Sequence, residues 1–431
     1  MHRAGAANQG NEEAIFVRKR VGVSLIGVVC VAMLAVAAAQ SRPTAGKTIA
    51  IGWVGDKSGP TVVAQAPVLH GLEAYFKYVN DKGGINGDKI NFIEKDDGYS
   101  PAKELEAVKS LVNDDKVSLV TGLGQSSGVA SIVPVLTAAK VPGFLNQATL
   151  HEISDPFQPY MFEGNCNYSD QADVALAIMM QRLKLKTLKG KKVGVSGIEV
   201  ASGQEWISIL DKRVPQLGGT TVDVVTPAAI VNADVQVQKL QDAKVGFVLM
   251  HSAAPGAIAM LKSMSKYGLN VPVSGSFGVT NENTWLSVGY DASKNFIGTN
   301  CYTPPLLAKT ATGKLAAATG TKYGYPASEI SQMNYSLGWV NAQIIVQALK
   351  NAKGNYSGAA VKAGLEKISS LDTGGLAPSV NLSAKCHMAI RAVRPYTYNY
   401  KLKSVAPIGT YAQWQKYITN GYAAPGTCGK K

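Results

Sequence analysis

The stretch from Ile49 to Pro101 constrains the fold of this chain more than any other part of its sequence. An apolar run over residues 49–54 leads to a Ser-Gly-Pro turn, an amphipathic segment over Val68–Val79 and a Gly-Gly-Ile turn. A second apolar run, Ile90–Ile93, then leads to Asp96-Asp97. Because glycine supplies the positive backbone angles that close such a turn, the pattern predicts a strand, a crossover helix and a parallel strand. In open α/β sheets, ligands bind at the carboxyl ends of such strands.

The same alternation continues in two series, which predicts an α/β protein with two doubly wound parallel-sheet lobes. The expected strands are Thr48–Val54, Lys89–Glu94, Val117–Gly122 and Val141–Asn146, then Lys192–Gly197, Thr221–Val225, Val245–His251 and Val271–Gly275. The expected helices are Val68–Val79, Pro101–Asn113, Gly128–Lys140, Gln204–Gln216, Asp234–Ala243, Gly256–Tyr267, Ala327–Lys350 and Ala359–Ile368. Extended segments are expected from Leu382 to Tyr400, and an irregular tail from Tyr411 to Lys431.

The first residues have the pattern of an export signal rather than of a folded core. Arg18-Lys19-Arg20 precedes an apolar run from Val21 to Ala39 that ends in three alanines, which predicts a cleaved signal peptide over residues 1–39. A membrane anchor is the alternative, because the run approaches transmembrane length. The 431 residues, 46% of them hydrophobic, suffice for a sizeable core and two or more domains. We therefore expect an exported protein.

Four cysteines remain beyond the leader: Cys166, Cys301, Cys386 and Cys428. In an oxidising compartment they permit two disulfides with three possible pairings, and free buried thiols are the alternative. The formal charge of +14 falls to +12 without the leader, which carries four basic and two acidic residues. The lysines form no basic blocks and accompany no nucleic-acid-binding motif, so we expect no nucleic-acid partner.

The segment Gly124-Gln125-Ser126-Ser127-Gly128 follows an expected strand and precedes an expected helix. It matches the nucleophile elbow of α/β-hydrolases, and His251 and His387 follow downstream. No His-Gly-Gly oxyanion motif accompanies it, and a Gly/Ser-rich turn also binds ligand oxygens through N–H groups and hydroxyls. A hydrolase-like enzyme with Ser126 as nucleophile is therefore the alternative to a binding protein.

Cofactor and metal motifs are missing from the sequence. The glycines at 122, 124 and 128 depart from the dinucleotide-binding spacing, and there is no phosphate-binding Walker loop. No two histidines stand four residues apart, and the cysteines beyond the leader form no C-x-x-C pair. We expect neither a cofactor nor a metal.

The Ser-Gly-Pro turn, the segment Asn80-Asp-Lys-Gly-Gly-Ile and Asp96-Asp97 with Pro101 resemble the start of periplasmic binding proteins of the branched-chain amino-acid (leucine/isoleucine/valine) type. The resemblance runs from about Lys47 to Tyr400. It implies a type I periplasmic binding fold with a three-segment hinge, which crosses near Met161–Asn167, Ile297–Pro304 and Met388–Pro395. Residues 47–165 and 302–388 would form lobe 1, and residues 166–301 and 389–431 lobe 2. Because the first two crossings run side by side in that family, the resemblance implies the pairs Cys166–Cys301 and Cys386–Cys428.

The resemblance also implies a ligand site after two strands of lobe 1. The hydroxyls of Ser126 and Thr149 and the backbone near Gln147 would hold a ligand carboxylate, with Gln125 beside them. Hydroxyls and N–H groups at a helix N-terminus suit an anion. Taken singly, Ser126 could be a helix cap and Thr149 an ordinary loop residue.

The second half departs from the family at the ligand. Phe277 stands where amino-acid-binding members carry a glutamate for the α-ammonium, and Glu282 lies five residues further on. Phe277 could also be a core residue. Ala64 and Ala253 replace family aromatics, Ser202 replaces a tyrosine, and Tyr335 keeps its aromatic ring. Since an unpaired buried cation is costly, we expect a small carboxylate without a free ammonium, such as an aromatic or aliphatic acid. A branched-chain amino acid held otherwise is the alternative.

The implied function is that of the periplasmic solute-binding component of an ABC importer. Its partners would be a small-molecule ligand and an inner-membrane ABC permease, and the protein would be monomeric and not an enzyme.

Overall fold

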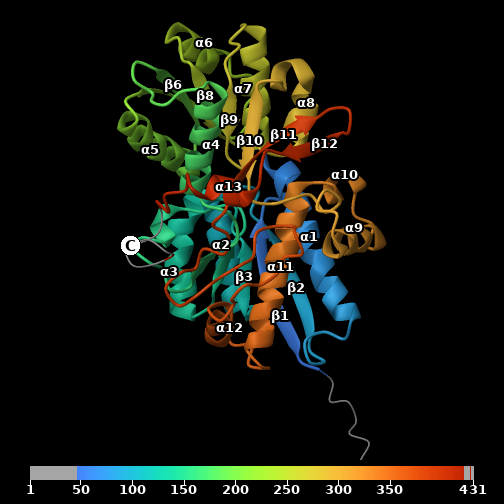
Figure 1. Cartoon of the computed structure of the whole chain (residues 1–431). Helices are drawn as coiled ribbons and strands as arrows, with labels where there is room; N and C mark the ends of the chain where they lie inside the picture. The colour runs from blue at the N-terminus through green and yellow to red at the C-terminus, as the bar shows by residue number, and fades with distance from the viewer. Residues whose placement is uncertain (1–45, 422–427, 429–431) are drawn as a thin grey trace, which may run out of the picture. The chain divides into compact units, whose positions relative to one another are not determined.

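The computed structural model describes residues 46–421 and Cys428. The expected signal peptide lies outside the described residues. Two mostly parallel sheets organise the described chain (Figure 1), which confirms the expected α/β fold class.

The first sheet has five parallel strands in the order β2-β1-β3-β4-β5. Its strands are β1 (Thr48–Gly55), β2 (Lys89–Asp96), β3 (Leu119–Gly122), β4 (Gly143–Leu145) and β5 (Met161–Glu163). The helical segments between them are α1 (Val62–Asp81), α2 (Pro101–Asn113), η1 (Ser126–Gly128), α3 (Val129–Ala139) and η2 (His151–Ile153). This order reverses direction between β1 and β3, so that the loops after these two strands flank a crevice where such sheets bind ligands.

The second sheet has seven strands in the order β12-β11-β10-β9-β8-β6-β7. They are β6 (Lys192–Ile198), β7 (Thr220–Thr226), β8 (Phe247–His251), β9 (Val273–Gly275), β10 (Phe296–Asn300), β11 (Arg394–Asn399) and β12 (Ser404–Pro407). The helices among them are α4 (Tyr168–Arg182), α5 (Ala201–Gln216), α6 (Asp234–Asp242), α7 (Ala254–Lys266) and α8 (Glu282–Ser293). Strands β6 to β10 are parallel, and β11 and β12 add an antiparallel edge. Here the reversal lies between β6 and β8.

The C-terminal third supplies helices to the first sheet and an edge to the second. Its helices are α9 (Ala311–Lys322), α10 (Ala327–Ile330), α11 (Met333–Asn351), α12 (Gly358–Leu365) and α13 (Tyr411–Gln415). Helix α11 packs along α1 at very short range. A Cβ on Gly71 would lie 2.2 Å from the Tyr335 carbonyl oxygen, and one on Gly338 would lie 1.9 Å from the Val68 carbonyl oxygen. The two glycines therefore set the close approach of these helices.

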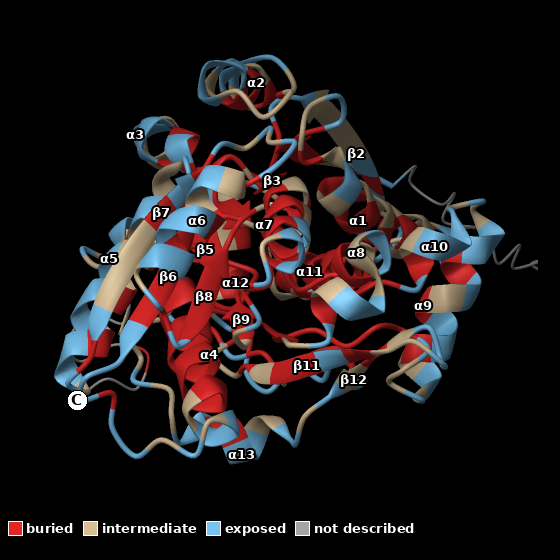
Figure 2. Cartoon of the chain, turned by 90° about the horizontal axis from the view of Figure 1, so that it is seen from above, coloured by how far each residue is buried: buried red, intermediate tan, exposed pale blue. Residues whose placement is uncertain are grey.

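Helix α4 explains one failure of the sequence patterns. Twelve of its residues are buried (Figure 2), so it has no solvent-facing stripe whose period could reveal it. The sequence patterns also missed β5, α8, β10 and α9. The single helix expected over Ala327–Lys350 is interrupted at Ser331 and Gln332, and the tail expected to be irregular begins with α13.

Three chain segments pass side by side between the sheets. Cys166 and Cys301, on the first two, form a disulfide with a Cα–Cα distance of 6.1 Å. On the third, the His387 carbonyl accepts from the Glu163 N–H at 2.9 Å. A second disulfide joins Cys386 to Cys428. Both bonds are those that the family resemblance implies, whereas the lobe boundaries remain a prediction.

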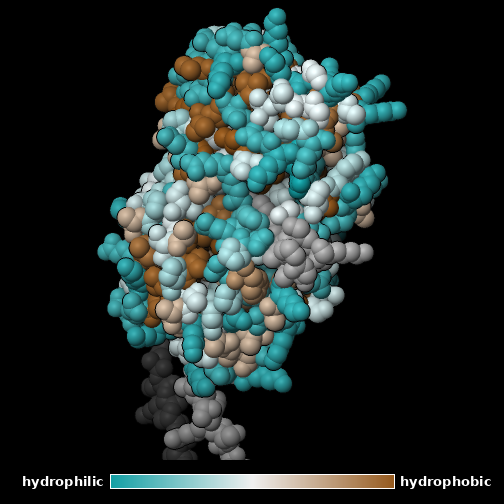
Figure 3. Space-filling view, turned by 90° about the vertical axis from the view of Figure 1, so that its left-hand side faces the viewer, coloured by the Kyte–Doolittle hydropathy of each residue, from teal (hydrophilic) through white to brown (hydrophobic). Residues whose placement is uncertain are grey.

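The surface is mixed in character. Hydrophilic residues cover much of the side shown in Figure 3, with smaller hydrophobic areas between them. Among the described helices, none combines the length and the apolar character needed to cross a bilayer.

Candidate ligand-binding site

A cavity of about 60 Å³ lies where loops from both sheets meet. The first sheet contributes Thr61, Ala64, Gln65, Tyr99, Gly124 and Gln147; the second sheet and its helices contribute Tyr168, Ile198, Ser202, His251, Ser252, Ala253, Phe277 and Gly278. Most of these residues follow the carboxyl ends of strands, and several flank the two strand-order reversals, where ligand sites of such folds occur. Aspartate, glutamate, lysine and arginine do not occur among them.

The loop before α1 is held by a buried carboxylate. Asp56 accepts hydrogen bonds from the Thr61 N–H and hydroxyl, both at 2.7 Å, and from the Ser58 N–H at 3.1 Å. Gln65 completes the loop, because its Oε1 accepts from the Asp56 N–H and its Nε2 donates to the Thr61 hydroxyl, both at 2.9 Å. The Ser-Gly-Pro turn is thereby fixed, and Thr61 and Gln65 line the cavity.

Gln125 and Ser126 lie beside the cavity rather than on its wall. The Gln125 side chain caps η1 by accepting from the Ser127 N–H at 2.6 Å. The Ser126 hydroxyl accepts from the Ser202 N–H, at the start of α5, at 3.1 Å. Behind the loop, the Glu104 carboxyl accepts from the Gln125 N–H at 3.3 Å, and burial raises the pKa of Glu104 well above its usual range.

The loop after β4 carries the other two residues expected to hold a carboxylate. Gln147 lines the cavity, and its carbonyl accepts from the Tyr168 hydroxyl at 3.0 Å. Thr149 is fully buried, and its hydroxyl has no hydrogen-bond partner within the described chain. Such a buried unpaired hydroxyl is uncommon and calls for an explanation.

His251 ends β8 and forms part of the opposite wall. Its Nε2 lies 3.0 Å from the Ser202 hydroxyl, and its Nδ1 lies 2.6 Å from the Ser276 hydroxyl. Burial lowers the pKa of His251 to about 3, so the imidazole is neutral. The His251 ring also meets Tyr168 edge to face, with centroids 4.6 Å apart.

Phe277 both lines the cavity and is buried. Its N–H donates to Gln171 Oε1 at 2.6 Å, and its ring stacks on Tyr168 with centroids 5.9 Å apart. Glu282 does not line the cavity; its Oε1 accepts from the Met333 N–H, at the start of α11, at 3.3 Å. Phe277 therefore brings no charge to the cavity wall. The Glu282 carboxyl, the nearest acid in sequence, is hydrogen-bonded to the start of α11 instead.

Of the other residues expected at the site, Ala64, Ser202 and Ala253 line the cavity. Tyr335 does not: it is fully buried between helices, and its hydroxyl donates to the Ala316 carbonyl at 3.1 Å. The structure thus gathers Ala64, Gln147, Ser202, Ala253 and Phe277 at one cavity and leaves Gln125, Ser126, Thr149 and Tyr335 off its wall.

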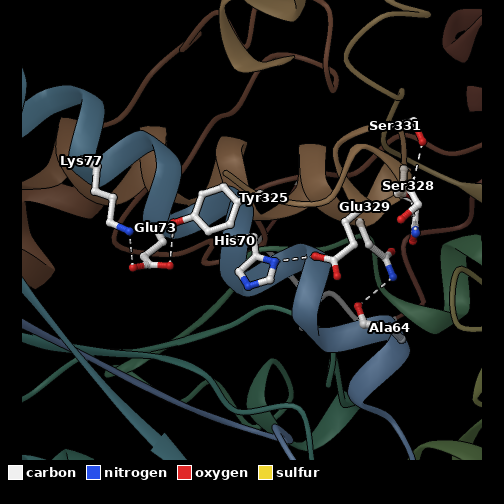
Figure 4. Close-up of polar contacts among 10 residues, drawn as sticks. Ala64, His70, Glu73, Lys77, Tyr325, Ser328, Glu329 and Ser331 are labelled. Atoms are coloured by element: carbon white, nitrogen blue, oxygen red, sulfur yellow. Dashed lines mark hydrogen bonds and ion pairs between the residues drawn. The ribbon is translucent and has the colours of Figure 1, made fainter. Parts of the chain in front are cut away.

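Polar contacts fasten α1 to the start of α11 and to the segment before it (Figure 4). The Ala64 carbonyl accepts from the Asn334 amide at 3.0 Å, and His70 pairs with Glu329. Glu73 accepts from Lys77 and from the Tyr325 hydroxyl; burial would raise its pKa, but these bonds lower it below its usual range. The cavity-facing start of α1 is therefore held in place from outside the site.

A Ser-His catalytic pair is not formed at Ser126 in the described chain. His251 bonds Ser202 and Ser276, and His387 bonds the Met161 carbonyl at 2.8 Å and Glu366 at 3.1 Å. Within the same residues, no group of three His, Cys, Asp or Glu side chains is placed to hold a metal ion.

Of the four aromatic side chains on the cavity wall, the sequence predicted Phe277 as a site residue but not Tyr99, Tyr168 or the wall position of His251. His251 closes an apolar run at the carboxyl end of a strand, which was a usable signal. Tyr168 begins a helix with no amphipathic pattern, so nothing in the sequence marked it.

Comparisons with known proteins show the family and the fold of the chain. A family model described as periplasmic binding protein matches residues 48–403. The Leu/Ile/Val-binding protein homolog 7 of Brucella abortus is 25% identical over 363 residues, covering 78% of this chain and 85% of that protein. A branched-chain amino acid ABC transporter protein of Thermus thermophilus with bound valine superposes with a TM-score of 0.76 at 22% identity, covering 86% of this chain and 99% of that one. A solute-binding protein of R. palustris in complex with 4-hydroxybenzoate superposes with a TM-score of 0.72 at 18% identity, covering 84% and 96%.

Proposed function

Because the chain belongs to the periplasmic binding protein family, we propose that it is the solute-binding component of an ABC importer and captures a small carboxylate without a free ammonium group. Family membership confirms the resemblance found in the sequence and the expectation of a binding protein rather than an enzyme.

The observation that carries the ligand proposal is the composition of the cavity wall. Its side chains are hydroxyl, amide, aromatic and aliphatic groups, with Phe277 on the wall and Glu282 turned to α11. An ammonium ion buried there without a carboxylate partner would lose several kcal/mol of hydration free energy. A carboxylate, in contrast, is well served by hydroxyls and by N–H groups at a helix N-terminus. The Ser202 N–H is such a group, and in this structure it donates to the Ser126 hydroxyl.

The ligands named for similar proteins frame the choice. Valine, bound by the T. thermophilus protein, has both an ammonium and a carboxylate, whereas 4-hydroxybenzoate, bound by the R. palustris protein, has only the carboxylate. The aromatic wall of Tyr99, Tyr168, His251 and Phe277 supports the second kind of ligand.

The size of the cavity supports a closing mechanism. At about 60 Å³ it is smaller than the roughly 150 Å³ that holds a benzene molecule. We propose that the lobes part to admit the ligand and then close about the three crossing segments. Contacts available for closure are the Ser202 N–H to Ser126 bond, the Ala201 N–H to Ser127 bond at 3.2 Å and the His151 N–H to Glu205 bond at 2.9 Å.

A signal peptide over residues 1–39 would export the protein, and the two disulfides suit an oxidising compartment. The closed protein would be presented, as a monomer, to an inner-membrane ABC permease.

A thermal-shift panel tests the ligand class. We expect benzoate, 4-hydroxybenzoate, 3-phenylpropanoate or 4-methylpentanoate at 1 mM to raise the melting temperature, because a ligand at 100 times its Kd adds about 2.7 kcal/mol to stability. Leucine, valine and phenylalanine should have little effect. Stabilisation by the amino acids alone would refute the proposal.

A further inference from the structure

Tyr168 is the one aromatic residue of the cavity wall whose hydroxyl reaches the backbone of the opposite sheet. It is the first residue of α4, it is 1% exposed, and it follows the first crossing segment directly. Its hydroxyl donates to the Gln147 carbonyl, after β4, at 3.0 Å. The tyrosine therefore bridges the loop expected to hold the ligand and the helix that begins the second half of the site.

The Tyr168 oxygen faces protein groups from both halves of the site. Besides its bond to the Gln147 carbonyl, it interacts with the Ser202 side chain and the Thr149 backbone. Burial raises the pKa of Tyr168 well above its usual range, so the hydroxyl keeps its proton and remains a donor to the carbonyl. The Gln147 carbonyl, which has two lone pairs, shares one of them with the Tyr168 hydroxyl.

An ammonium group needs acceptors for up to three protons. Phe277 offers none, and the Gln147 carbonyl is already engaged by a neutral donor of the protein itself. We propose that Tyr168 is a specificity-determining residue: its hydroxyl competes with a ligand ammonium for the Gln147 carbonyl and thereby weakens the binding of amino acids. This inference rests on the proposed function and adds a second residue, beside Phe277, to the ammonium-excluding wall.

The ring of Tyr168 has a separate role, which the test must preserve. It stacks on Phe277 at an interplanar angle of 9° and meets His251 edge to face. Tyr168→Phe removes the hydroxyl and keeps both ring contacts, so that the change in selectivity reports on the hydroxyl alone. Tyr335→Phe is the matched control, because Tyr335 is also a buried tyrosine whose hydroxyl donates to a backbone carbonyl, that of Ala316, but it lies off the cavity wall.

The experiment measures Kd by calorimetry for 4-methylpentanoate and for leucine, which differ by the ammonium group. We expect Tyr168→Phe to lower the ratio of the leucine Kd to the acid Kd at least tenfold. The double variant Tyr168→Phe/Phe277→Glu should lower this ratio more than Phe277→Glu alone does. Tyr335→Phe should leave the leucine-to-acid Kd ratio within twofold of the wild-type value. If the phenylalanine variant fails a circular dichroism check of its fold, Tyr168→Leu, which lacks the hydroxyl and adds no other donor, takes its place.

The failures of the two proposals are distinguishable. If the wild-type protein binds 4-methylpentanoate and the Tyr168 variants have the same leucine-to-acid Kd ratio as the wild type, the role of Tyr168 is refuted while the proposed function stands. If the wild-type protein binds leucine more tightly than the acid, the proposed ligand class fails, and with it this inference.

Discussion

The amide of Ser202 donates a hydrogen bond to the hydroxyl of Ser126 at 3.1 Å, which ties the start of α5 to the loop after β3. The amide is one of the helix-terminal donors that have no partner within the helix. Ser126 is also the hydroxyl expected to hold a ligand carboxylate. A bound carboxylate would therefore compete for, or add to, the contact that joins the two halves of the site.

Ser126→Ala should weaken acid binding about tenfold, or about 1.4 kcal/mol, because it removes one hydrogen-bonding group from the ligand and from the contact with α5. Calorimetric titration with the tightest acid measures this. Ser127→Ala is the matched control, since its exposed hydroxyl accepts from the Ala201 N–H but is not expected to touch the ligand. Equal effects of the two variants would place the carboxylate elsewhere.

Thr149→Val should raise the free energy of unfolding of the ligand-free protein by about 1 kcal/mol, because a buried unpaired hydroxyl is replaced by a methyl group. The same change should lower acid affinity if the hydroxyl binds the ligand. Urea unfolding and calorimetry check both, with Thr149→Ser as the variant that keeps the hydroxyl. A valine variant that binds the acid as well as the wild type would remove Thr149 from the site.

The sequence predicted the sheets better than it predicted the cavity. Strands β1, β2 and β6 and helix α2 were recognisable because their apolar periods and their Gly, Pro and Ser boundaries are local properties. The cavity wall was found where the family resemblance supplied positions, as for Ala64, Ser202 and Phe277. Tyr168 could not be found, because its role depends on a carbonyl 21 residues away that tertiary folding brings to it. For Tyr335 the family resemblance was misleading. Tyr335 matches a ligand-site aromatic residue of the family, but its hydroxyl donates to the Ala316 carbonyl and the residue does not line the cavity.

The stability of the protein should fall as pH rises from about 5 to 8, in part because of Glu163. This residue is 1% exposed, and burial raises its pKa from 4.5 to about 8. The hydrogen bond from the Ser154 hydroxyl, at 2.7 Å, lowers the pKa but does not offset the effect of burial. Since the folded pKa lies above the unfolded value, the stabilising contribution is full below about pH 4.5 and is lost as pH rises through 8.

Glu163→Gln should make the decline of melting temperature with pH shallower over this range, because the amide does not ionise. The exposed Glu106→Gln variant should leave the decline unchanged. A pH profile identical in the Glu163→Gln and wild-type proteins would show that the carboxyl ionises without cost.

The two disulfides should differ in their contribution to stability. Cys166–Cys301 closes a loop of 135 residues and Cys386–Cys428 one of 42, so chain entropy predicts that loss of the first costs about 1 kcal/mol more. Urea unfolding of the Cys166→Ala/Cys301→Ala and Cys386→Ala/Cys428→Ala variants measures the difference. An equal or reversed order would mean that contacts near the tail, rather than loop length, dominate.

We propose that this cavity selects a carboxylate and rejects an ammonium. Calorimetric titration of the wild-type protein with two matched pairs, 4-methylpentanoate against leucine and 3-phenylpropanoate against phenylalanine, tests it most directly. We predict that, in at least one pair, the acid binds about 100-fold more tightly than the amino acid, a difference of about 2.7 kcal/mol. Tighter binding of leucine or phenylalanine than of its matched acid would contradict the claim.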